Sequence, residues 1–91
     1  MKIRAMITIK GLVQGVSFRY YTQQTALRHN VSGWVRNLRD GRVAGCFEGE
    51  EQDVRALIDW CRQGPARSRV DEALVETGEY RGEFTGFEIR R

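Results

Sequence analysis

Histidine and cysteine are scarce in this sequence. The chain has one histidine, His29, and two cysteines, Cys46 and Cys61, and it has no Cys-x-x-Cys motif. A zinc site is therefore not expected. In a cytosolic chain the two cysteines are predicted to be small buried side chains. A disulfide between them would depend on a geometry that the sequence does not give.

Long apolar runs are also absent, and we expect no leader. No stretch approaches the ~20 consecutive apolar residues that a membrane helix requires. Residues 1–4 lead into an alternating strand pattern and not into the apolar core of a signal peptide. A length of 91 residues suits one domain with a modest core. We therefore expect a single domain over residues 1–91 that is cytoplasmic, monomeric and not attached to a membrane.

Neither sign of charge dominates the chain. Fifteen basic and twelve acidic residues give a net charge of +3, which is compatible with a small anionic substrate. The basic residues are spread along the sequence, so they argue only weakly for a nucleic-acid partner. The closest cluster, Arg67-Ser68-Arg69, is too short to indicate one.

Apolar spacing predicts five strands and two helices. Alternation from Lys2 to Lys10 is typical of a strand, and apolar residues at helical spacing form a stripe on the second helix. We predict strands at 2–10, 31–38, 42–48, 70–77 and 84–90, and helices at 18–29 and from about 50 to the Gly64-Pro65 pair. Asp40-Gly41 predicts a two-residue hairpin, Asn30 a left-handed stop to the first helix, and Gly49 the end of the third strand.

Each predicted helix has one apolar side. On the second helix this side comprises Val54, Leu57, Ile58 and Cys61, with Trp60 at its edge. On the first helix it comprises Phe18, Tyr21 or Thr22, Thr25 or Ala26, and His29. The element order β-α-β-β-α-β plus a last strand predicts an α+β, ferredoxin-like split βαβ sandwich. Its antiparallel sheet carries two helices on one face and an extra C-terminal strand.

The segment from Gly11 to Arg19 connects the first strand to the first helix. Gly11 and Gly15 allow a tight turn and a close approach to a ligand, and free amides at a helix N-terminus favour an anion. Arg19 adds a planar fork that can hold two phosphate oxygens. The segment lacks the Lys-Ser/Thr of a Walker loop and the spacing of dinucleotide folds. The alternative is a tight turn beside a solvated arginine.

Asn37 is a second candidate, near the end of the strand that follows the first helix. A helix returns the chain to the same end of the sheet, so Asn37 is expected near the loop. The alternative role for Asn37 is to form a turn.

Groups that could attack phosphorus or transfer a proton are missing from the loop. It has no cysteine or histidine, and Ser17 has no base beside it in sequence. His29 is expected to pack and not to catalyse, and no carboxylate cluster predicts a magnesium site. Such a loop suits an activated phosphate ester. In a mixed anhydride the leaving group is a carboxylate with a parent acid pKa of about 4, so no general acid is needed.

Two motifs in this order closely resemble the acylphosphatase family. They are Val13-Gln14-Gly15-Val16-x-Phe18-Arg19, and Gly33-Trp34-Val35-x-Asn37 followed by Asp40-Gly41. The resemblance continues to the closing Phe87-Glu88-Ile89-Arg90. It implies a ferredoxin-like hydrolase that converts acyl phosphates to carboxylate and inorganic phosphate without metal or cofactor.

The resemblance also implies a role for single residues. Arg19 is similar to the phosphate-binding arginine of the family, aided by backbone amides of Gln14, Gly15, Val16, Ser17 and Phe18. Asn37 is similar to the residue that orients the attacking water. The family mechanism uses the substrate's own phosphate to assist proton removal, which suits a site without a general base.

Two other functions fit parts of the sequence. The same fold could hold an anionic ligand such as carbamoyl phosphate without hydrolysing it, although Arg19 and Asn37 together favour activity. RNA binding on the sheet would need exposed aromatic residues on central strands. The first and third predicted strands contain only Phe47, so no nucleic-acid partner is expected.

Overall fold

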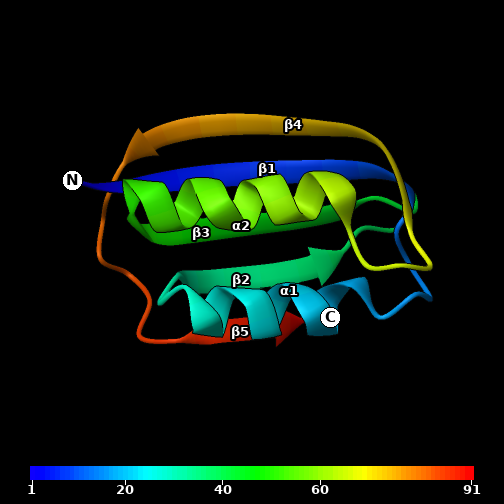
Figure 1. Cartoon of the computed structure of the whole chain (residues 1–91), viewed down its shortest axis with the longest axis horizontal. Coiled ribbons are helices and arrows are strands. Elements are labelled where there is room, and N and C mark those ends of the chain that lie inside the picture. The colour runs from blue at the N-terminus through cyan, green and yellow to red at the C-terminus, as the bar shows by residue number, and fades with distance from the viewer.

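Five strands form one sheet, and two helices lie side by side on one of its faces (Figure 1). The computed structural model describes residues 1–91. The elements are β1 (Lys2–Leu12), α1 (Phe18–Arg28), β2 (Ser32–Asn37), β3 (Val43–Glu50), α2 (Glu51–Gln63), β4 (Arg69–Glu79) and β5 (Phe87–Arg90). The predicted ferredoxin-like α+β fold, with its extra C-terminal strand, is confirmed. Neither helix has the length and apolar character needed to cross a membrane.

The sheet has the strand order β4-β1-β3-β2-β5. All neighbouring strands are antiparallel except β2 and β5, which are parallel, so the expected antiparallel sheet is in fact mixed. The cause is the connection from residue 80 to residue 86. It leaves β4 at the end of the sheet where β2 begins and crosses to the far edge, so β5 starts at that same end (Figure 1).

The core lies between the sheet and the helices. Ala5, Ile7 and Ile9 of β1 are buried, as their alternation predicts. All four stripe residues predicted on α2 are buried, and Trp60 packs at the edge of the core. On α1 the buried residues are Phe18, Thr22, Thr25 and Ala26. Tyr21 is exposed, and His29 follows the last helical turn, so neither belongs to the buried side of α1.

Several strand ends differ from the predicted ranges, and the structure gives a reason for three of them. β3 continues through Gly49 because β1 pairs with it there, Ile3 opposite Gly49. β1 continues to Leu12, which pairs with β4 after a register shift that follows Lys10. Gly11 has φ of +140°, and a Cβ there would lie 2.1 Å from the Arg69 carbonyl oxygen, so only glycine fits. β5 begins at Phe87, because residues 84–86 belong to the connection from β4.

The turn between β2 and β3 is longer than the two-residue hairpin predicted from Asp40-Gly41. It closes where the Leu38 amide donates to the Arg42 carbonyl oxygen at 2.8 Å. The Asp40 carboxylate accepts hydrogen bonds from the backbone and the side chain of Arg42, which stabilises the wider turn. The left-handed stop predicted at Asn30 is confirmed by its φ of +57°.

Both cysteines are free and buried. Burial raises the pKa of the Cys61 thiol to about 12 and raises the pKa of the Cys46 thiol as well. We expect neither thiol to react with a disulfide reagent at pH 8 unless the protein unfolds, because the reactive form is the thiolate. A thiol titration with and without denaturant measures this directly. Rapid reaction of either thiol in the native protein would contradict it.

The same raised pKa predicts an alkaline loss of stability. The unfolded chain loses the Cys61 proton near pH 9, whereas the folded chain keeps it to about pH 12. The contribution of the protonated Cys61 thiol to the free energy of unfolding is therefore complete below pH 9 and falls as the pH rises towards 12. In urea unfolding experiments, the free energy of unfolding should decline less between pH 8 and pH 11 in Cys61→Ala than in the wild type.

Candidate active site

The connection between β1 and α1 is anchored at both ends and turns sharply between them. Val13 and Phe18 are buried in the core, and the Phe18 ring packs against Trp60 at a centroid distance of 5.6 Å. Between these anchors, Gly15 and Ser17 have φ of +75° and +61°. A left-handed serine is uncommon and costs energy, so the surrounding fold imposes this conformation. It is the type of local strain found at ligand sites.

The backbone amides of this loop have no partner within the protein. No amide from Gln14 to Phe18 donates a hydrogen bond, and the first that does is Tyr21, to the Ser17 carbonyl oxygen at 3.2 Å. The Ser17 side chain does not cap α1. The loop and the N-terminus of α1 therefore present a group of free N–H donors together with the positive end of the helix dipole.

Arg19 is held in the first turn of α1 by the last strand of the sheet. Its Nη1 donates to the Arg90 carbonyl oxygen on β5 at 3.0 Å, and its other N–H groups have no partner in the chain. One turn further, Gln23 Nε2 donates to the Phe87 carbonyl oxygen at 2.9 Å. These contacts fix α1 against β5 and leave most of the guanidinium free to bind a ligand.

Asn37 lies at the end of β2, at the same end of the sheet as the loop (Figure 1). Its Oδ1 is buried and is the one buried side-chain polar atom in the chain without a hydrogen-bond partner. Most buried polar atoms are paired, so this acceptor is available to a ligand or a water. The side chain of Gln14 connects the two segments, because its Nε2 donates to the carbonyl oxygens of Leu38 at 2.7 Å and Arg42 at 3.0 Å.

These residues surround one cavity, which we call the loop cavity. Its volume is about 410 Å³, and it is lined by Val13, Gln14, Gly15, Ser17, Phe18, Arg19, Tyr20, Asn37 and Ile89. The structure thus brings Arg19 and Asn37 together, as the motifs predict. Val16 alone among the predicted residues does not line it. Tyr20 and Ile89 were not predicted. Ile89 enters through the parallel pairing of β5 with β2, which has no signal in the local sequence.

The lining residues define what the cavity can do chemically. None of them is an aspartate, glutamate, histidine or cysteine, and no group of three or more such side chains in the chain is arranged to hold a metal ion. The cavity offers a guanidinium, free backbone amides and one unpaired amide oxygen. These groups can bind a phosphoryl group and orient a small hydrogen-bond donor, but they do not supply a strong base.

Comparison with known proteins shows which family has this sequence and fold. The sequence model of the acylphosphatase family matches residues 5–89. The chain belongs to the acylphosphatase family. The acylphosphatase of Geotalea uraniireducens is 71% identical over 89 residues, covering 98% of each chain. That of Geobacter sulfurreducens is 61% identical and covers 99% of each.

Solved structures agree with the acylphosphatase assignment. The crystal structure of acylphosphatase from Bacillus subtilis matches with a TM-score of 0.94 at 31% identity, covering 98% of this chain and 99% of that chain. Acylphosphatases are hydrolases that act on acid anhydrides, and this chain is an enzyme of that class.

Proposed function

We propose that this acylphosphatase hydrolyses acyl phosphates to carboxylate and inorganic phosphate without a metal ion. In this proposal Arg19 and the amides from Gln14 to Phe18 bind the phosphoryl group, and Asn37 orients the attacking water. The observation that carries it is the unpaired, buried Oδ1 of Asn37 in the cavity that Arg19 also lines. A guanidinium that donates to phosphoryl oxygens and an amide oxygen that accepts from a water thus line one cavity.

The phosphoryl oxygens carry the charge that this cavity is built to hold. Free amides at the N-terminus of α1 donate to one side of the group. Arg19 is held by the Arg90 carbonyl oxygen and donates its remaining N–H groups in a planar fork. In phosphoryl transfer the transition state spreads charge over the equatorial oxygens, so fixed donors around them supply most of the rate.

Asn37 acts on the nucleophile and not on the phosphate. Its Oδ1 accepts a hydrogen bond from a water and holds a lone pair of that water towards phosphorus. An amide oxygen cannot take the proton, and no lining residue is a base. The proton therefore passes to a phosphoryl oxygen of the substrate. The leaving carboxylate is stable at neutral pH and needs no acid.

The test is phosphate release from benzoyl phosphate in the presence of EDTA. We expect full turnover by the wild type. In Asn37→Ala kcat is expected to fall by about 10²-fold or more, because the water is no longer oriented. The inhibition constant of inorganic phosphate should stay within a few fold. Gln24→Ala removes an exposed amide on α1 and serves as the control with unchanged kcat.

Each contrary result overturns a different part of the proposal. Turnover that disappears in EDTA and returns with a divalent cation would overturn the metal-free reaction. Turnover near the wild-type rate in Asn37→Ala would overturn the role of Asn37. A folded wild type that binds inorganic phosphate but releases none from benzoyl phosphate would be a binding module and not an enzyme.

A further inference from the structure

A second cavity adjoins the loop cavity at the loop between β1 and α1. We call it the acyl cavity. Its volume is about 460 Å³, and it is lined by Gly15, Val16, Ser17, Tyr21, Trp60, Pro65, Ala66 and Arg67. Gly15 and Ser17 line both cavities. A ligand bound at Gly15 and Ser17 is therefore next to both cavities.

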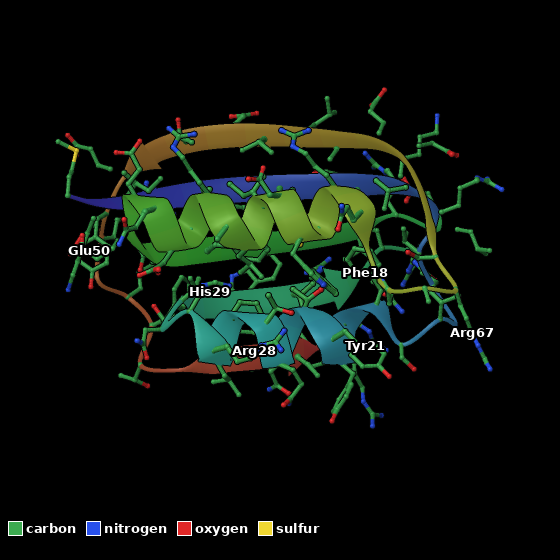
Figure 2. The ribbon with its side chains drawn as sticks, in the orientation of Figure 1. Phe18, Tyr21, Arg28, His29, Glu50 and Arg67 are labelled. Carbon is green, nitrogen blue, oxygen red and sulfur yellow. The ribbon has the colours of Figure 1, made fainter.

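The acyl cavity differs in chemistry from the loop cavity. Trp60 and Pro65 provide apolar surface that is only partly buried, and Tyr21 is exposed beside them. The position of the Trp60 ring is fixed by its contact with the buried ring of Phe18. Figure 2 shows Phe18, Tyr21 and Arg67 at the same end of the molecule, on α1 and on the segment that follows α2. This surface suits an apolar or planar group.

Arg67 gives the acyl cavity a charge. It forms no ion pair, unlike Arg69 two positions later, which is paired with Asp71. No lining residue of the cavity is acidic. Arg67 is therefore a free cation at the rim and attracts a negative group on whatever occupies the cavity.

The direction of the reaction determines which part of the substrate lies in each cavity. In phosphoryl transfer the attacking oxygen and the leaving oxygen lie on opposite sides of phosphorus. Asn37, at the water side, lines only the loop cavity, and Trp60 and Arg67 line only the acyl cavity. With the phosphoryl group at the loop, the leaving group points away from Asn37.

We infer that the acyl cavity binds the acyl group of the substrate. Its apolar body packs on Trp60 and Tyr21, and a negative charge at its far end interacts with Arg67. The preferred substrates are acyl phosphates whose acyl group has an apolar or aromatic body and a distal carboxylate. The inference rests on the proposed function, because without phosphoryl binding at the loop the second cavity has no leaving group to hold.

Substrate ratios measured across variants test this assignment. We would compare kcat/KM for acetyl, benzoyl and 4-carboxybenzoyl phosphate in the wild type, Ala66→Trp and Arg67→Gln. Comparing these ratios between variants cancels the intrinsic reactivity of each acyl phosphate. The exposed Ala66 allows a bulky residue without disturbing the core. Arg62→Gln on α2, exposed and outside both cavities, is the matched control.

The expected changes are selective. Ala66→Trp fills the acyl cavity and should lower the benzoyl-to-acetyl ratio by about tenfold. Arg67→Gln should lower the 4-carboxybenzoyl-to-benzoyl ratio by about 3-fold, an effect that high salt removes. Arg62→Gln should leave both ratios unchanged. Circular dichroism confirms that each variant is folded.

The contrary results distinguish a failure of the acyl cavity from a failure of the proposed function. An unchanged benzoyl-to-acetyl ratio in Ala66→Trp would overturn the acyl cavity, while hydrolysis itself would stand. An unchanged carboxybenzoyl ratio in Arg67→Gln, or an equal change in Arg62→Gln, would overturn the preference for a distal charge. Absence of turnover on all three acyl phosphates would overturn the proposed function and the acyl cavity with it.

Discussion

Arg19→Lys is expected to lose almost as much activity as Arg19→Ala, although it keeps the positive charge. Arg19 Nη1 is bound to the Arg90 carbonyl oxygen at 3.0 Å, and the rest of its planar fork faces the loop cavity. Lysine would have one ammonium to divide between that carbonyl and the phosphoryl oxygens. We expect kcat/KM to fall by about 10³-fold in Arg19→Ala and to recover by no more than about tenfold in Arg19→Lys.

The measurement is phosphate release from benzoyl phosphate together with inhibition by inorganic phosphate. Both should be lost in Arg19→Ala, because one group binds the ground state and the transition state. Arg28→Ala is the matched control, since Arg28 is an exposed arginine on the same helix (Figure 2). A lysine variant with activity near that of the wild type would show that charge alone suffices.

The fold could be predicted from the sequence where apolar spacing dictates burial. The alternation of Ala5, Ile7 and Ile9 and the stripe on α2 each bury the side chains that their spacing indicates. The prediction for α1 was less accurate. Threonines occupy two of its buried positions, and each hydroxyl hydrogen-bonds a carbonyl oxygen one turn earlier. Hydropathy does not distinguish Thr22, buried in this way, from the exposed Tyr21.

Properties set by distant parts of the chain were not predictable. The continuation of β3 through Gly49 and of β1 to Leu12 depends on the partner strands, because pairing satisfies backbone groups that local sequence would leave free. The parallel placement of β5 likewise follows from the path of residues 80–86. These pairings bring Ile89 to the loop cavity and the Arg90 carbonyl oxygen to Arg19.

Only those residues of the candidate site that belong to a sequence motif could be predicted. Two motifs indicated Arg19, Asn37 and the loop, and the structure places them around one cavity. The unpaired state of Asn37 Oδ1 and the free cation at Arg67 are properties of the folded chain. No spacing in the sequence distinguishes Arg67 from Arg69, which is neutralised by Asp71.

Glu48→Ala is expected to cause a large loss of stability, although Glu48 does not line the loop cavity. Glu48 lies on β3 and its side chain is fully buried. It accepts hydrogen bonds from the backbone amides of Arg81 at 2.8 Å and Glu83 at 3.1 Å, and from Arg4 Nη1 at 3.4 Å. Alanine would leave the two backbone amides without their acceptor, whereas Arg4 would keep its hydrogen bond to Glu83. We expect the free energy of unfolding to fall by about 3 kcal/mol.

Two matched variants separate this effect from a general loss of charge. Glu50→Ala removes a half-exposed carboxylate from the same strand, whose partner is the N-terminal amine at 3.2 Å, and should cost less than about 1 kcal/mol. Glu48→Gln keeps an acceptor oxygen for one amide but turns its NH₂ towards the other donors, so an intermediate loss is expected. Urea unfolding midpoints at constant m-value measure the loss of stability in Glu48→Ala, Glu50→Ala and Glu48→Gln.

The loss should extend to the candidate site, because Glu48 fixes the connection that leads into β5. Its two amide donors belong to residues 80–86, and the same segment accepts a hydrogen bond from Gly33 of β2 through the Gly86 carbonyl oxygen at 2.9 Å. β5 in turn holds Arg19 through Arg90. In Glu48→Ala we therefore expect weaker phosphate inhibition even at temperatures where the protein stays folded. A destabilised variant with unchanged phosphate affinity would show that β5 keeps its position without Glu48.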